Sequence, residues 1–411
     1  MQTLLVKVTS LSYKWPRRVR PAPFSHTTHL EDGCTSATLE RTVLTERPDY
    51  QAGVPSYSGA PDAASLRPAS SAFHSRAGES NPDSQPRLRA SVAPRPNGST
   101  DSSRRSNQPV PTVVVYHHFS TARHELTDAL DISTDPESFR RHVKYYAKNF
   151  DLIAPSDLLG GKLPRKPLLI TFDDVYRSVL EIGGPILREA DIQSIWFMNP
   201  DCLESETLPL DNLLTLAAAH YGSAGLLRLL ALPDSASASV PALISDHLST
   251  LNYAQIAMLR TAICAGLPET QTEVRRRSNL FITKDDLWRL PEYGIQIGNH
   301  SLTHSFFRSL SRAELQIEIQ RSRELLEQLS GQPVTCLAIP YGNELDATEA
   351  VLTTARSSGH RAIFLVHGRS NASRPAPDVY FRICADRLRS EFLPISIGIL
   401  PRLRTFRDWL R

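Results

Sequence analysis

The chain has 411 residues, of which 41% are hydrophobic, and a formal net charge of +3. This length and apolar content suit one large folded domain or two ordinary ones, and the absence of a basic stripe with interleaved aromatic residues argues against nucleic-acid binding. No apolar run approaches the roughly 18 residues of a membrane span, and the first residues lack the continuous apolar stretch of a signal peptide. We therefore expect a cytoplasmic protein with no membrane span.

The cysteines point to the same compartment. The chain has five of them, scattered along its length, and no two form a Cys-x-x-Cys pair. An odd and unpatterned set argues against both a disulfide framework and a thiolate zinc site, and it is typical of a reducing environment.

Two parts of the chain differ in composition. Residues 1–110 mix Pro, Ser and Arg with few apolar runs, so we expect a disordered tail. Residues 111–411 contain apolar segments with clear periodicity, and they are predicted to form the folded domain.

Short apolar strands alternate with helices through the folded part. The expected strands cover residues 112–116, 152–154, 167–172, 192–198, 295–297, 337–340 and 362–366. The expected helices follow Asp135-Pro136, cover residues 178–190, open at a Ser311/Glu314 capping box and end at Gly331, and run from Asp346 to before Gly359. This alternation predicts an α/β fold with parallel strands and a site at their carboxyl ends.

One stretch interrupts the alternation. Residues 211–283 are rich in Leu and Ala at helical spacing and carry few strand signals. We expect a helical insertion between two β/α units.

Three segments place polar side chains directly after apolar strands. They are Thr171-Phe172-Asp173-Asp174, His300-Ser301-Leu302-Thr303-His304 and Pro340-Tyr341-Gly342. Two histidines four residues apart can reach one ion from the same side of a helical turn, and a carboxylate from another strand completes a hydrolytic metal site. Adjacent carboxylates point in different directions, so one can bind metal while the other accepts a proton. Each motif alone also suits a surface histidine pair, a helix cap or a plain turn.

The order of these motifs resembles that of the polysaccharide deacetylase (NodB-homology) family. The family's strand-end Tyr-His motif is similar to Tyr116-His117-His118, and the motifs of residues 171–174 and 300–304 follow in family order. Residues 340–342 and 381–383 extend the match over most of the chain after residue 110. The resemblance implies an irregular (β/α) barrel of about seven strands.

The resemblance also implies roles for individual residues. Asp173 would be the general base, and Arg382 would hold its carboxylate ionised through a charge-assisted pair. Asp174, His300 and His304 would bind a divalent metal, for which two histidines and a carboxylate suggest zinc. The Tyr341 backbone N–H would stabilise the oxyanion. Pro340 and Tyr341 would contact the substrate.

Two departures from the family pattern bear on activity. Val175 follows the two aspartates where family members usually have Gly, and no histidine follows Arg382 to act as the general acid. His117 and His118 are candidates for that role, with a structural role as the alternative reading of both. His367 is a further candidate.

The leading hypothesis is a metal-dependent hydrolase that removes N-acetyl groups from an N-acetylated saccharide, such as a cell-envelope polysaccharide or an oligosaccharide precursor. The alternative, motivated by Val175 and the missing late histidine, is a non-catalytic carbohydrate-binding protein on the same barrel. Glycoside hydrolysis by Asp173 and Asp174 is disfavoured, because adjacent residues cannot flank a glycosidic bond.

Overall fold

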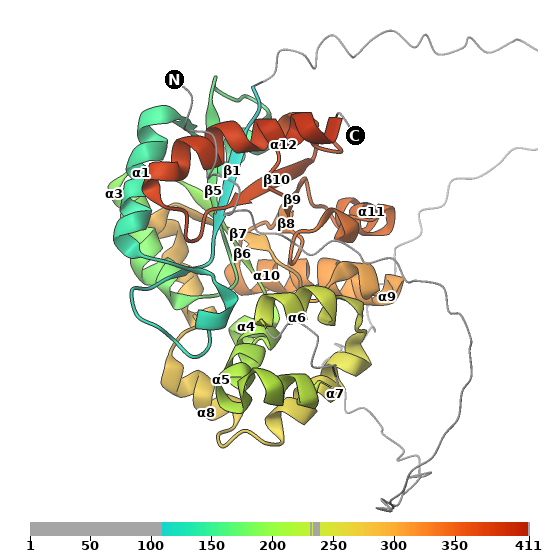
Figure 1. The fold of residues 1–411 in the computed structure, drawn as a ribbon. Coiled ribbons are helices and arrows are strands. Elements are labelled where there is room, and N and C mark those ends of the chain that lie inside the picture. Colours follow the sequence, from blue (N-terminus) through green and yellow to red (C-terminus); the bar gives the residue numbers. More distant parts are fainter. Residues whose placement is uncertain (1–108, 231, 233–238, 410–411) are drawn as a thin grey trace, which may run out of the picture. The chain divides into compact units, whose positions relative to one another are not determined.

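The computed structural model describes residues 109–230, 232 and 239–409 (Figure 1). The predicted disordered tail, residues 1–110, lies almost entirely outside the described residues.

Parallel strands close into a seven-stranded barrel, so the predicted fold class is confirmed. The strands are β1 (Thr112–Tyr116), β5 (Pro167–Asp173), β6 (Ser194–Met198), β7 (Ile295–Asn299), β8 (Cys336–Ala338), β9 (Ala362–Val366) and β10 (Val379–Cys384). Each pairs with the next in this order, and β10 pairs with β1 to complete the ring. Because all strands run in the same direction, their carboxyl ends meet at one mouth of the barrel.

Two strands differ from the prediction. The segment expected at residues 152–154 forms only β4 (Asp151–Leu152), which pairs with β5 outside the closed ring. It ends early because Pro155 opens helix α2, and the residue before a proline is held in an extended conformation. The seventh barrel strand is instead β10, whose central Arg382 breaks the apolar run by which a buried strand is recognised.

The helices that follow the strands lie outside the barrel. They are α1 (Pro136–Asn149), α2 (Pro155–Gly160), α3 (Gly184–Glu189), α9 (Arg312–Gln316), α10 (Ser322–Ser330), α11 (Glu349–Ser357) and α12 (Leu400–Trp409). Asp135 caps α1 as predicted, since its side chain accepts a hydrogen bond from the Ser138 N–H at 2.8 Å. Asp346 does not open α11, which is capped by Thr348. The buried Asp346 carboxylate instead accepts a hydrogen bond from the Arg308 N–H at 3.3 Å.

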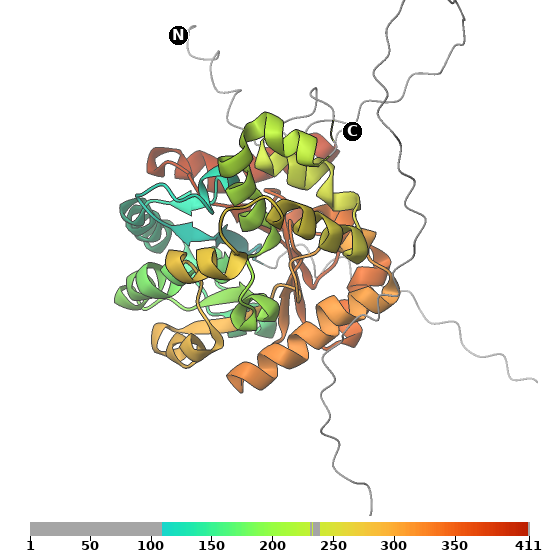
Figure 2. The same ribbon diagram turned by 90° about the horizontal axis from the view of Figure 1, so that it is seen from below.

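Between β6 and β7 the chain leaves the barrel and forms further helices. These are α4 (Pro200–Glu204), α5 (Leu210–Leu229), α6 (Val240–Asp246), α7 (Tyr253–Cys264) and α8 (Gln271–Ser278). Figure 2 looks along the barrel and shows this group across its mouth, whereas α12 lies at the opposite end in Figure 1. Within the described part of the chain, no helix is long and apolar enough to cross a membrane.

Apolar side chains fill the barrel interior below the mouth. Phe197 and Phe364 lie inside with ring centroids 5.2 Å apart, and the Arg382 guanidinium lies 5.2 Å from the Phe197 ring centroid. The apolar layer therefore ends where the charged groups at the strand ends begin.

Candidate active site

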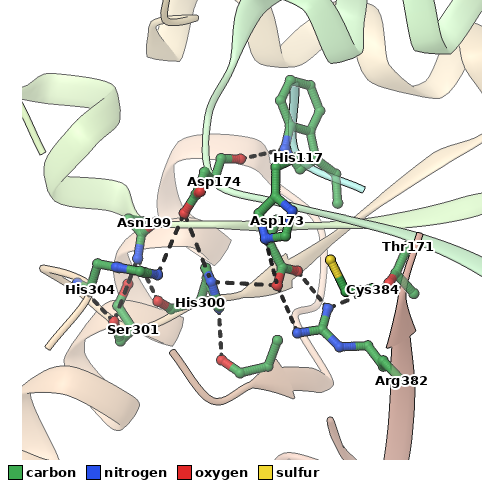
Figure 3. Close-up of polar contacts among 12 residues, drawn as sticks. His117, Thr171, Asp173, Asp174, Asn199, His300, Ser301, His304, Arg382 and Cys384 are labelled. Atoms are coloured by element: carbon green, nitrogen blue, oxygen red, sulfur yellow. Dashed lines mark hydrogen bonds and ion pairs between the residues drawn. The ribbon is translucent and has the colours of Figure 1, made fainter. Parts of the chain in front are cut away.

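Side chains from four strands converge at the mouth of the barrel (Figure 3). Asp173 ends β5 and Asp174 follows it, His300 follows β7, Arg382 lies on β10, and His117 follows β1. The structure thus brings residues of the Asp-Asp and His-x-x-x-His motifs together with Arg382 and with His117 of the Tyr-His segment. Asp173 and Asp174 point in different directions, as their adjacency predicts, because Asp174 has left the strand with a φ of 64°.

Asp173 and Arg382 form a buried two-pronged ion pair. The guanidinium nitrogens lie 2.5 and 2.7 Å from the two carboxylate oxygens. Burial alone would raise the pKa of Asp173, but the attraction of Arg382 and then of His300 lowers that pKa to about 2. Asp173 is therefore ionised throughout the physiological range.

His117 faces Asp173 on one side and a residue not predicted from the sequence on the other. Its Nε2 lies 4.0 Å from Asp173 Oδ2, and its Nδ1 lies 2.6 Å from Asp386 Oδ2. Burial would lower the pKa of His117, but the Asp386 carboxylate overrides this effect and raises the pKa to about 9. The imidazole is thus cationic at neutral pH, with a proton on the nitrogen that points into the site.

Asp174, His300 and His304 form a cluster of metal-capable atoms. One ligand atom from each lies within 4.8 Å of the others. His300 Nε2 lies 3.9 Å, and His304 Nε2 lies 3.6 Å, from Asp174 Oδ1. Two imidazoles and one carboxylate with an open side suit a zinc-type divalent ion.

The Nδ1 atoms of both histidines are engaged away from this cluster. His300 Nδ1 lies 2.9 Å from the Ala338 carbonyl oxygen, so Nδ1 is the protonated nitrogen and the Nε2 lone pair faces the cluster. His304 Nδ1 lies 3.3 Å from Asp211 Oδ2, at the start of α5. These bonds orient both rings as metal ligation requires. The pKa of His300 is lowered to about 4, first by burial, which keeps this ring neutral.

Asp211 was predicted only as the start of the helical insertion. Besides meeting His304, its Oδ1 accepts a hydrogen bond from the Tyr341 hydroxyl at 2.8 Å. Tyr341 in turn stacks on Phe306, with ring centroids 3.7 Å apart. The insertion therefore contributes directly to the support of one histidine in the cluster.

The loop between the two histidines is not the helical turn that their spacing suggested. Ser301 and His304 both have positive φ values, 69° and 62°, in a segment without helical hydrogen bonding. The fully buried Glu318 carboxylate accepts hydrogen bonds from the Leu302 and Thr303 N–H groups at 2.8 and 3.0 Å. Backbone in this sparsely populated conformation persists only where the surrounding structure holds it, and here the hydrogen bonds to Glu318 hold it.

The helical insertion is linked to this loop through Glu318. The Tyr253 hydroxyl on α7 hydrogen-bonds to Glu318. On the barrel side, the Asn199 amide donates to the carbonyl oxygens of His300 and Ser301. The loop is thus held from both the barrel and the insertion.

The Pro340-Tyr341-Gly342 segment forms a tight turn beside β9. Tyr341 and Gly342 have φ values of 59° and 60°. A Cβ atom on Gly342 would lie 2.2 Å from the Val366 backbone nitrogen, so only glycine fits there. The turn places the Tyr341 ring 4.6 Å from that of His304, between ring centroids.

The other candidate histidines have partners other than Asp173 and Asp174. His118 is buried, and its Nδ1 lies 2.9 Å from the Ser133 hydroxyl. Burial lowers the pKa of His118 to about 4. His367 lies 3.5 Å from Glu344. The Val175 side chain is fully buried in the apolar core.

The sequence was compared with models of known protein families. The family model for polysaccharide deacetylases matches residues 160–363. The chain belongs to the polysaccharide deacetylase family. It is accordingly a hydrolase of the deacetylase class. The match includes Asp173, Asp174 and both histidines of the cluster, whereas His117, Arg382 and Asp386 lie outside it.

Several solved structures are similar to this deacetylase-family chain. A deacetylase of Streptococcus pyogenes, PplD, in complex with acetate has 13% identity over 71% of this chain and 100% of its own, with a TM-score of 0.48. A polysaccharide deacetylase from Bacillus cereus has 13% identity over 70% and 69%, with a TM-score of 0.46. IcaB from Ammonifex degensii has 15% identity over 72% and 98%, with a TM-score of 0.44. No curated protein sequence matches the chain.

Proposed function

We propose that this protein is a metal-dependent de-N-acetylase of an N-acetylated saccharide, a cell-envelope polysaccharide or an oligosaccharide precursor. The observation that supports this most is the placement of an anionic Asp173 and a cationic His117 on one side of the Asp174, His300 and His304 cluster. A proton acceptor and a proton donor thus lie beside the same ligand cluster, as amide hydrolysis requires.

Asp174, His300 and His304 are the proposed metal ligands, and zinc is the proposed ion. A divalent ion bound there would polarise the acetamido carbonyl and acidify a water molecule. The donor set fits this assignment, because His300 already presents an unprotonated Nε2 and Asp174 is not part of the Arg382 pair.

Asp173 would accept the proton of the attacking water as the new carbon–oxygen bond forms. Arg382 keeps this carboxylate ionised and fixed before the reaction. The Tyr341 N–H would donate to the oxyanion of the tetrahedral intermediate, and Pro340 and Tyr341 would contact the substrate.

His117 would then supply the proton that the leaving nitrogen needs when the carbon–nitrogen bond breaks. The products are acetate and the free amino sugar. Asp386 supports this role, because its carboxylate holds the ring and favours the protonated form. His117 thereby replaces the histidine that is missing after Arg382, and this arrangement favours catalysis over the alternative of a non-catalytic binding protein.

The test is acetate release from N-acetylglucosamine oligomers by the full chain with added zinc, beside Asp173→Asn, His300→Ala and His117→Ala. We expect zinc-dependent release in the wild type and loss in all three variants. His220→Ala, an exposed histidine of α5, is the matched control and should retain release. Metal binding through His300 without release from any N-acetylated glycan would refute the proposed activity.

A further inference from the structure

A second group of metal-capable atoms lies beside the first. One ligand atom each of His117, Cys384 and Asp386 lies within 4.8 Å of the others. Asp386 Oδ2 is the shared centre, at 2.6 Å from His117 Nδ1 and 3.4 Å from Cys384 Sγ. Cys384 is an exposed residue, whereas Asp386 is buried.

Strand geometry explains why these residues meet. Arg382, Cys384 and Asp386 alternate along β10 and its extension, so their side chains lie on the same side. The extension stays beside β1, because the Ala385 N–H donates to the Val115 carbonyl oxygen at 2.9 Å. His117 follows β1 immediately and therefore faces the end of β10.

The Asp386 carboxylate is held with one oxygen turned toward the other two ligands. Its Oδ1 accepts hydrogen bonds from the Thr134 hydroxyl at 3.0 Å and from the His117 N–H at 3.2 Å. Both bonds leave Oδ2 facing the imidazole and the thiol. The orientation is therefore set by hydrogen bonds to the carboxylate oxygen that faces away from the other two ligand atoms, and such outer bonds are typical of metal-ligating carboxylates.

We propose that His117, Cys384 and Asp386 form a second, inhibitory site for a thiophilic divalent metal such as zinc or cadmium. Imidazole, thiolate and carboxylate are all zinc ligands, and three of them leave one position for water. With bonds of about 2.0–2.3 Å, tetrahedral ligand atoms lie roughly 3.3 Å or more apart. The His117 ring would move away from Asp386 by several tenths of an ångström to admit the ion.

Binding at this site would weaken the proton donor. A metal on Nδ1 takes the place of the proton there, so the ring can no longer be an imidazolium, and the N–H that remains at Nε2 is a much weaker acid. The inhibitory consequence rests on the proposed function, because it requires His117 to be the general acid. The binding of the ion does not.

The binding test uses the metal-stripped full chain titrated with cadmium chloride, with the ultraviolet charge-transfer absorption of a cadmium–thiolate bond as the readout. We expect this band in the wild type and in His300→Ala, and its loss in Cys384→Ser. Cys34→Ser and Cys264→Ser are the cysteine controls, and both should keep the band. Asp386→Asn, which leaves the thiol in place, should weaken the band and guards against a folding defect in Cys384→Ser.

The activity test is acetate release at increasing zinc concentration. We expect inhibition at excess zinc, with the inhibitory concentration raised about 10-fold or more by Cys384→Ser. No band in the wild type, an equal band in Cys384→Ser, or unchanged zinc inhibition in that variant would each overturn the proposal. A Cys384-dependent band in a protein that never releases acetate would sustain the second site and refute the proposed function instead.

Discussion

The surroundings of His117 and of His304 share one arrangement, although we propose different roles for the two histidines. In each half an aspartate faces the Nδ1 of a histidine, Asp386 for His117 and Asp211 for His304. In each case burial opposes the charge, and nearby carboxylates raise the histidine pKa to about 9, chiefly Asp386 for His117 and Asp174 for His304. What differs is the partner of Nε2, which is Asp173, the proposed general base, on one side and Asp174, a proposed metal ligand, on the other. We propose that the group facing Nε2, and not the aspartate at Nδ1, sets the role of each imidazole.

The origins of the two aspartates also differ. Asp386 lies two residues beyond barrel strand β10, whereas Asp211 lies in the first turn of insertion helix α5. The proposed proton-transfer half is thus built by the barrel alone; it consists of Asp173, Arg382, His117 and Asp386. The proposed metal half, which consists of Asp174, His300 and His304, depends on the insertion. Variants in each half should therefore have separable effects.

The largest effect is expected where the halves meet, at Asp173. Asp173→Asn keeps the size of the side chain but removes the proton acceptor, and kcat should fall by about 10²- to 10⁴-fold. Zinc content, measured by atomic absorption, should match that of the wild type because the ligand residues are untouched. Loss of zinc together with activity would assign Asp173 to the metal half instead.

Asp211→Asn is expected to weaken the metal half. The amide cannot support His304 as the carboxylate does, so zinc affinity should fall about 10- to 100-fold. A competition titration with a zinc chelator measures this change. An unchanged affinity would show that the insertion only covers the site.

Asp386→Asn is expected to act on the pH profile. A pKa raised to about 9 means that His117 is protonated at lower pH and loses its proton as pH rises through 9, so activity should decline there. Without the carboxylate this decline should move toward the ordinary histidine value of about 6.5, and activity at pH 8 should fall by about 10-fold or more. A basic limb that stays in place would remove His117 from the role of general acid.

The smallest effect is expected at Tyr253. Tyr253→Phe removes the hydrogen bond from α7 to the buried Glu318, at a cost of about 1–3 kcal/mol in the free energy of unfolding. Urea denaturation measures this cost, and Tyr145→Phe on α1 is a matched control. Equal stability of the wild type and the variant would show that the insertion does not hold the histidine loop.

Sequence patterns predicted the parts of the site that are contiguous. The barrel strands and the Asp-Asp and His-x-x-x-His motifs were visible because local periodicity and spacing encode them. The proton-transfer half was visible only in His117 and Arg382. Asp386 had one available signal, its alternation with Arg382 beyond an apolar run, but β10 itself was not predicted as a strand. Asp211 had none, since its partner His304 lies far along the chain and meets it only through tertiary folding.

The most direct test is zinc-dependent acetate release by Asp211→Asn and Asp386→Asn, measured side by side over a range of zinc concentrations. If the two halves are separable, zinc added below the inhibitory range restores Asp211→Asn toward wild-type release at pH 7 to 8. Asp386→Asn, in contrast, binds zinc normally at Asp174, His300 and His304 and stays slow. If zinc restores both variants, or neither, the division of the site into a metal half and a proton-transfer half is contradicted.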